Sequence, residues 1–142
     1  MATKIDPNLL VYFGNNFVPL GSAQVGILTH ALNYGTGVFE GIRAYWQESE
    51  EEVFVVRPRE HYERWRRHAA ILRIDLPLSA SELCALTAEL IRRNNLRTDL
   101  YIRPLAYKSA ERIGVHFDDQ SQFAIVALPL SLIHISEPTR PY

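Results

Sequence analysis

Four basic side chains at helical spacing form the first group in this sequence that could carry chemistry. Arg57, His61, Arg64 and His68 follow one another at intervals of four, three and four residues. On a helix this spacing places all four on one face. An arginine beside a cleft suits a phosphate group, because its planar guanidinium donates two hydrogen bonds in a fixed geometry. The pattern therefore indicates an anion site, although an ordinary solvated basic face would have the same spacing.

A tyrosine and an arginine two residues apart form the second group. Tyr101 and Arg103 lie in the β-like segment Asp99–Leu105. Side chains at positions i and i+2 of a strand project from the same face of the sheet. A hydroxyl and a guanidinium side by side are suited to hold a carboxylate. The alternative is a partly buried strand in which Arg103 pairs with an acid elsewhere in the protein.

The segment His30–Arg43 combines three glycines with aromatic side chains. The glycines, Gly41 among them, allow the backbone to bend or to approach a neighbour closely. Tyr34 and Phe39 could line an apolar pocket, and Arg43 would stand at the start of a strand. Pockets for small ligands usually have this composition, mostly apolar with few polar groups. A glycine-containing β-turn with core aromatics is the alternative interpretation.

Strand pairs and two helices are expected to position these groups. Proline is tolerated in the first turn of a helix, so the first helix should open at Pro58. The sequence Ser79-Ala80-Ser81-Glu82 fits a capping box, so the second helix should run from there to about Asn94. Two strand pairs are expected, 9–13 with 17–20 and 42–46 with 53–56, and two further strands at 100–107 and 123–130. Residues 108–115 are expected to form a loop. This order favours an α+β fold with helices on one side of a largely antiparallel sheet.

The composition indicates one globular domain and argues against several functional classes. The chain has 142 residues, enough for one core and short for two. Its formal net charge of −1 argues against a nucleic-acid partner. No apolar run approaches the roughly 20 residues that span a bilayer, so no membrane partner is expected. Without a secretory signal at the start, and with Cys84 as the single cysteine, the expected location is the cytoplasm.

Taken together, these blocks resemble the fold-type IV aminotransferases that use pyridoxal phosphate, and the branched-chain amino-acid aminotransferases in particular. The resemblance covers Asn8 to Leu130 and rests on four motifs. They are FEGIR (Phe39–Arg43), REHYER (Arg59–Arg64), RRNNL (Arg92–Leu96) and YIRPLAYKSAERIGV (Tyr101–Val115). The resemblance implies the small amino-terminal domain of the D-amino-acid-aminotransferase-like fold. It also implies amino-group transfer between leucine, isoleucine or valine and 2-oxoglutarate.

The same resemblance implies roles for individual residues. Arg64 would bind the phosphate of pyridoxal 5'-phosphate. Tyr101 and Arg103 would help to recognise a carboxylate of the amino acid or 2-oxo acid. Tyr34 and the loop at Gly114-Val115 would reach into the active site of a neighbouring subunit, so a homodimer or a larger homo-oligomer is expected. The residues that would border the substrate pocket are Phe39, Gly41 and Arg43. No metal is implied.

The family's reaction needs a lysine that forms a Schiff base with the cofactor and moves a proton between substrate and product. In the family this lysine, and the acid beside the pyridine nitrogen, belong to a second, carboxy-terminal domain. The two lysines of this sequence are Lys4 and Lys108. Lys4 belongs to a loose terminus that cannot hold a covalent bond in register, and Lys108 matches a loop residue of the family. The chain by itself is therefore expected to be inactive. It would supply the walls and the anion-binding side chains of one cofactor cleft.

The last dozen residues do not continue the strand pattern. Ser131 to Tyr142 read SLIHISEPTRPY and contain no cap or turn logic. They resemble a translated sequencing-adapter read-through. We therefore interpret residues 1–130 as an amino-terminal small domain and residues 131–142 as a non-native tail. A genuine disordered tail is the alternative.

Three other functions remain open on the sequence. Two share the fold, namely a D-amino-acid aminotransferase and an aminodeoxychorismate lyase, but neither usually carries the FEGIR and YIRP motifs together. The third treats the 142 residues as a complete, non-catalytic module for ligand binding or assembly.

Overall fold

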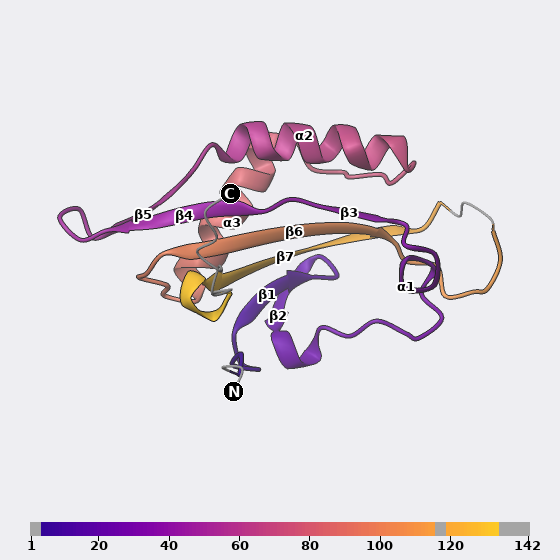
Figure 1. Ribbon diagram of the computed structural model, residues 1–142, viewed down its shortest axis with the longest axis horizontal. Coiled ribbons are helices and arrows are strands. Elements are labelled where there is room, and N and C mark those ends of the chain that lie inside the picture. Colours follow the sequence, from indigo (N-terminus) through magenta and orange to yellow (C-terminus); the bar gives the residue numbers. More distant parts are fainter. Residues whose placement is uncertain (1–3, 116–118, 134–142) are drawn as a thin grey trace, which may run out of the picture.

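The structure is a computed structural model that describes residues 4–115 and 119–133. Its strands, in chain order, are β1 (Leu10–Phe13), β2 (Asn16–Pro19), β3 (Gly37–Phe39), β4 (Ile42–Gln47), β5 (Glu52–Val55), β6 (Leu100–Lys108) and β7 (Ser121–Pro129). Within the described residues they form one seven-stranded antiparallel sheet in the order β2-β1-β7-β6-β4-β5, with β3 also paired to β6. Figure 1 shows the long β6–β7 pair running through the middle of this sheet.

The β6–β7 pair sets the frame of the sheet. It is in register from Leu100 opposite Pro129 to Lys108 opposite Ser121. The other edge of β6 is shared, since β4 pairs with its first part and β3 with its last part. Leu100 and Ile102 are buried, whereas Arg103, the next residue of β6, is exposed. The sheet therefore has a covered face and an open face.

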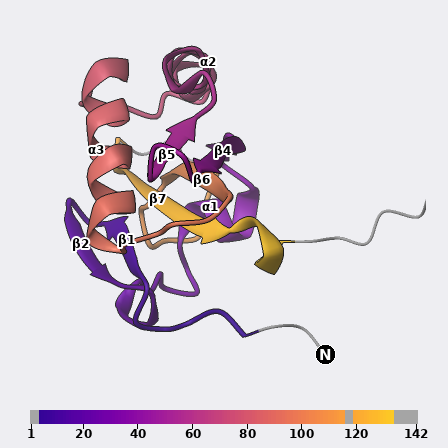
Figure 2. The same ribbon diagram turned by 90° about the vertical axis from the view of Figure 1, so that its left-hand side faces the viewer.

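Two long helices cover one face. They are α2 (Pro58–Ile71) and α3 (Ala80–Arg93), which Figure 2 shows on the same side of the curved sheet. The capping box of α3 is present, because Ser79 Oγ accepts from the Glu82 N–H and Glu82 Oε1 accepts from the Ser79 N–H. The core between helices and sheet contains Ile42, Ala44, Tyr62, Trp65, Ala69, Leu83, Leu90, Leu100, Ile102 and Ile125. Two helix–sheet layers of this kind confirm the predicted α+β class.

Most predicted elements are confirmed, with three corrections. The first is a short third helix in the described residues, α1 (His30–Tyr34), which ends at Gly35 in the left-handed conformation. The second is strand β3 in the segment expected only to bend. The third concerns Lys108, which was expected in a loop and instead ends β6. The first two elements span three to five residues and depend on partners distant in the chain, which local periodicity does not report.

The carboxy-terminal tail and the absence of a membrane-spanning segment were also predicted from the sequence. The tail predicted at 131–142 falls largely on residues 134–142, which lie outside the described residues. Across residues 4–115 and 119–133, we find no helix with the length and apolar character that crossing a membrane requires.

Candidate functional site

The segment from Val38 to Ala44 sends its side chains alternately to the two faces of the sheet. Val38, Glu40 and Ile42 lie on the face that the helices cover. Phe39, Gly41 and Arg43 lie on the open face, where Phe39 and Arg43 are exposed. This alternation continues through the break between β3 and β4, where the Glu40 N–H donates to the Pro104 carbonyl. One short segment thus contributes to two different surfaces.

Five of the predicted residues meet on the open face. This arginine–aromatic cluster consists of Phe39, Gly41, Arg43, Tyr101 and Arg103. The Arg103 guanidinium lies 4.3 Å above the centre of the Phe39 ring and 5.4 Å from that of Tyr101. Its Nη2 donates to the Tyr101 hydroxyl at 3.0 Å. The stacked geometry holds a cation against an apolar wall, a combination suited to a substrate with one carboxylate and one aliphatic group.

Gly41 is required by the close approach of Tyr101. A Cβ at position 41 would lie 2.6 Å from the Tyr101 hydroxyl and 3.1 Å from two ring carbons. Any side chain there would therefore push the tyrosine away from Arg103. Arg43 completes the cluster, since it stands opposite Tyr101 in the β4–β6 register.

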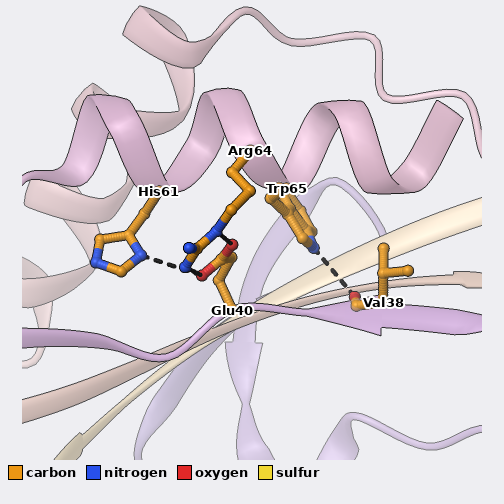
Figure 3. Close-up of polar contacts among 5 residues, drawn as sticks. All are labelled: Val38, Glu40, His61, Arg64 and Trp65. Carbon is orange, nitrogen blue, oxygen red and sulfur yellow. Dashed lines mark hydrogen bonds and ion pairs between the residues drawn. The ribbon is translucent and has the colours of Figure 1, made fainter.

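On the covered side, Glu40 joins the sheet to α2. Its carboxylate accepts from Arg64 through two atoms, Nε to Oε1 at 2.6 Å and Nη2 to Oε2 at 2.8 Å. A second contact comes from His61, whose Nδ1 lies 3.0 Å from Oε2. Figure 3 shows His61 and Arg64 reaching from the same face of α2 toward Glu40. Beside them, Trp65 Nε1 donates to the Val38 carbonyl at 3.0 Å.

These contacts fix the charge of Glu40. The Glu40 side chain is only 6% exposed, so burial by itself would favour the neutral acid. The hydrogen bonds from Arg64 outweigh this effect and, with those from His61, lower the pKa of Glu40 below its ordinary value of 4.5. Glu40 is therefore ionised at neutral pH, and Arg64 and His61 are its partners.

A basic depression of about 270 Å³ lies next to this ion pair. It is lined by Arg57, Glu60, His61, Arg64 and Arg67. Three of the four basic residues predicted for this face are present, but His68 is not, and Arg67 stands in its place. Arg57 is the N-cap of α2, with φ of 48°, so its side chain does not follow the helical register used in the prediction. The arginines make this depression suitable for an anion such as a phosphate.

The described residues do not form the single cleft that the sequence predicts. Neither Phe39 nor Arg103 lines the depression that Arg64 lines. Phe39 instead borders an apolar depression of about 310 Å³ together with Leu105 and Tyr107 on the same face of the sheet. The physical reason is the alternation around Glu40, which sends the Glu40 side chain toward Arg64 and the Phe39 side chain to the opposite face.

Glu40 is the residue that the sequence analysis missed. Glu40 belongs to the FEGIR motif, but the motif predicted no role for it. Strand alternation contained the missing signal, because Phe39, Gly41 and Arg43 on one face place Glu40 on the other. A buried acid opposite a basic helix must find a cation there.

Tyr34 and the loop near Val115, which are far apart in the sequence, lie side by side. The Gly114 N–H donates to the Tyr34 hydroxyl at 3.0 Å. The His30 N–H at the start of α1 donates to the Ala110 carbonyl at 2.8 Å, which holds α1 against the end of β6. Val115 is 88% exposed. The structure therefore brings together the two places expected to contact a neighbouring subunit.

Lys108 is unsuitable for covalent chemistry in this structure. Its side chain is 2% exposed, and its Nζ donates to the Arg73 carbonyl just beyond the end of α2. Its backbone N–H donates to the Thr36 carbonyl at 3.0 Å. Lys4, the other lysine of the sequence, is exposed. For a phosphate-bearing cofactor with a covalent anchor, the described residues offer suitable chemistry for the phosphate but not for the covalent anchor.

Known proteins similar to this chain share one family. Residues 37–139 match the family described as "Amino-transferase class IV". A "Probable branched-chain-amino-acid aminotransferase" of Aquifex aeolicus is 45% identical over 96 residues, which are 68% of this chain and 31% of that protein. A crystal structure of the branched-chain aminotransferase from Thermoproteus uzoniensis with norvaline superposes with a TM-score of 0.79 at 43% identity. The superposition covers 85% of this chain and 40% of the chain in that structure.

A second similar structure contains a cofactor derivative. It is the T.th. branched-chain amino acid aminotransferase complexed with N-(5'-phosphopyridoxyl)-L-glutamate, with a TM-score of 0.77 and 37% identity, covering 84% of this chain and 40% of that one. The chain spans about a third of the length of the curated relatives that it matches.

The Glu40 ion pair gives a stability that depends on pH. The pKa of Glu40 is lower in the folded chain than in the unfolded chain. The stabilisation by Glu40 is therefore fully present above its pKa in the unfolded chain, and it is lost as the pH falls through its pKa in the folded chain. We expect Glu40→Gln to lower the free energy of unfolding at pH 7, because the charged hydrogen bonds to Arg64 are lost. The loss should be only about 1 kcal/mol, because water screens the half-exposed guanidinium. The difference from wild type should shrink below pH 4.5, as followed by urea unfolding. A difference that stayed constant to about pH 3 would contradict this origin.

Proposed function

Because this chain belongs to the class IV aminotransferases, we propose that the protein of which it forms part transfers an amino group between branched-chain L-amino acids and 2-oxoglutarate. The observation that carries the proposal is the arginine–aromatic cluster, where Arg103 stacks on Phe39 and bonds to Tyr101. The similar proteins named branched-chain aminotransferases support the substrate class.

The proposed role of the cluster is to recognise the substrate at both ends. The bond to Tyr101 uses one of the five N–H donors of Arg103. The planar fork thus retains donors for a carboxylate, which it can hold with two parallel hydrogen bonds. Phe39 offers an apolar wall for an aliphatic side chain, and Gly41 gives Tyr101 the room to stay beside Arg103. Arg43 borders the same pocket.

The proposed cofactor is pyridoxal 5'-phosphate, held in this chain by Arg64. A complex of a similar protein with a phosphopyridoxyl derivative supports this assignment, and the basic depression around Arg64 has the donor chemistry that a phosphate needs. When bound, the cofactor supplies an electron sink for the reacting carbon. The covalent lysine is proposed to come from a part of the protein outside this sequence, because Lys108 is buried.

A homodimer is proposed as the smallest working unit. Tyr34 and Val115 form one exposed surface, joined by the bond from the Gly114 N–H. On the family resemblance, this surface reaches the active site of a second copy. We propose the cytoplasm as the compartment, which the single cysteine supports.

The function is tested with the protein encoded by the complete reading frame in the source DNA. We expect a second domain that carries a lysine, and turnover of leucine, isoleucine and valine with 2-oxoglutarate in a coupled glutamate assay. D-alanine should not be turned over above background. If no such domain follows in frame, the assignment to a working transaminase is wrong, and a preference for D-alanine over leucine would indicate a D-amino-acid aminotransferase.

Arg64→Ala in the complete protein should weaken the retention of pyridoxal 5'-phosphate. A charge-assisted hydrogen bond to phosphate is expected to change the dissociation constant by roughly 10- to 100-fold. Equilibrium dialysis against the cofactor measures the change. Arg67→Ala is the matched control, because Arg67 lines the same depression without a bond to Glu40, and it should have a smaller effect. Unchanged affinity in Arg64→Ala would remove the assigned role of Arg64.

The chain of 142 residues should not form a covalent adduct with pyridoxal 5'-phosphate at Lys108. Lys108 is buried and donates to the Arg73 carbonyl, so the aldehyde cannot reach its nitrogen. After borohydride reduction, mass spectrometry of the folded chain should find Lys108 unmodified. The urea-unfolded chain is the control, and Lys108 should be modified there. A stable adduct on Lys108 in the folded chain would contradict the proposal that the lysine lies elsewhere.

A further inference from the structure

Glu40 lies between two residues of the arginine–aromatic cluster, yet its side chain points to the opposite face, toward α2. There it is the acid that contacts Arg64, and its exposure is far lower than that of its partner. The Arg64 side chain is 51% exposed, whereas Glu40 is almost fully buried. A half-exposed arginine without an anchor samples many rotamers, so the buried carboxylate is what defines its position.

The contact uses one edge of the guanidinium. Arg64 donates to the two carboxylate oxygens through Nε and Nη2, which is the bidentate geometry. The end of the guanidinium formed by Nη1 and the second Nη2 N–H therefore points away from Glu40. Within the part of the chain that the structure describes, Nη1 has no hydrogen-bond partner, and the depression lined by Arg57 and Arg67 adjoins this side chain.

His61 keeps the carboxylate in place. A carboxylate only accepts hydrogen bonds, so the His61 Nδ1 must carry the proton in its contact with Oε2. Both oxygens of Glu40 are then satisfied, one by Arg64 alone and one by Arg64 and His61 together. The acid is held by two side chains one helical turn apart on α2, so it cannot follow Arg64 into solvent.

We propose that Glu40 is a positioning residue that holds the Arg64 guanidinium so that its outer end binds a phosphate group. The inference rests on the proposed function, in which Arg64 binds the cofactor phosphate. It adds a residue that never touches the phosphate and acts through the arginine alone. The ligand is the phosphate monoester of the cofactor, and inorganic phosphate shares its chemistry.

Simple electrostatics predicts the opposite effect of removing Glu40. A negative charge beside an anion site repels the anion, so its removal should by itself strengthen binding. In the positioning role, removal weakens binding, because the arginine must then be ordered at the moment the phosphate binds. The Glu40 charge is already paired with that of Arg64, which leaves positioning as the larger effect. Whether Glu40 removal strengthens or weakens phosphate binding therefore decides between electrostatic repulsion and positioning.

The test compares three variants of the protein encoded by the complete reading frame, each freed of bound cofactor, at neutral pH. Isothermal titration with pyridoxal 5'-phosphate, and separately with inorganic phosphate, gives each dissociation constant. We expect Glu40→Gln to weaken binding of both probes by roughly 3- to 10-fold. Glu60→Gln is the matched control, since it removes an equal charge from the lining of the same depression without touching Arg64. Because a negative charge is removed beside the anion, it should strengthen binding. Arg64→Ala should weaken binding more than either.

A spectroscopic readout follows the arginine itself and does not depend on the stability of the Glu40 variant. The Nε–H resonance of Arg64 in the ¹⁵N-labelled chain is identified by its loss in Arg64→Ala. We expect this proton to be protected from solvent exchange before and after phosphate is added, because Nε stays on Glu40.

The outcomes separate the inference from the proposed function. If Glu40→Gln strengthens binding as Glu60→Gln does, or if phosphate releases the Arg64 Nε–H to solvent, Glu40 competes with phosphate and the inference is overturned. In that case Arg64 keeps its assigned role. If wild type binds neither probe, or if Arg64→Ala binds both as wild type does, the phosphate assignment fails and the inference fails with it.

Discussion

A buried carboxylate has to be matched by a cation, and this requirement at Glu40 organises the site. Glu40 lies in the link between β3 and β4, whereas Arg64 and His61 belong to α2, so the ion pair joins the two layers at one point. Next to it, the Trp65 indole donates to the Val38 carbonyl and fixes the same helix against the same segment. The position of the arginine proposed to hold phosphate therefore depends on an acid in the sheet.

The strand geometry around Glu40 divides the work between the two faces of the sheet. Side chains that alternate along one segment place the Glu40–Arg64 pair and its basic depression on the covered side, and the arginine–aromatic cluster on the open side. Each surface is exposed and shallow in this chain, with depressions of about 270 and 310 Å³. Such surfaces acquire the burial typical of small-molecule sites only when further protein covers them. This agrees with a chain that spans about a third of its relatives.

A second buried charge has a structural explanation. Lys108 ends β6 and donates to the carbonyl of Arg73, beyond the last residue of α2. Carbonyls at the end of a helix lack partners within the helix and attract cations. Lys108 thus fastens the far end of the helix that carries Arg64, while the Glu40 ion pair fastens its middle. Both contacts join α2 to the sheet.

The sequence by itself determined the elements whose signals are local. Proline at the start of α2, the Ser79–Glu82 capping box and the alternation in β6 predicted two helices, most strands and the pairing of Tyr101 with Arg103, because propensity and periodicity act over a few residues. Only the tertiary structure decided the rest. Strand β3, the bond between the loop at Gly114 and Tyr34, the burial of Lys108 and the Glu40–Arg64 pair all join residues distant in the chain. Contacts of this kind depend on which faces the folded sheet brings together. Local alternation gives the face on which Glu40 lies, but not the partner that it meets there.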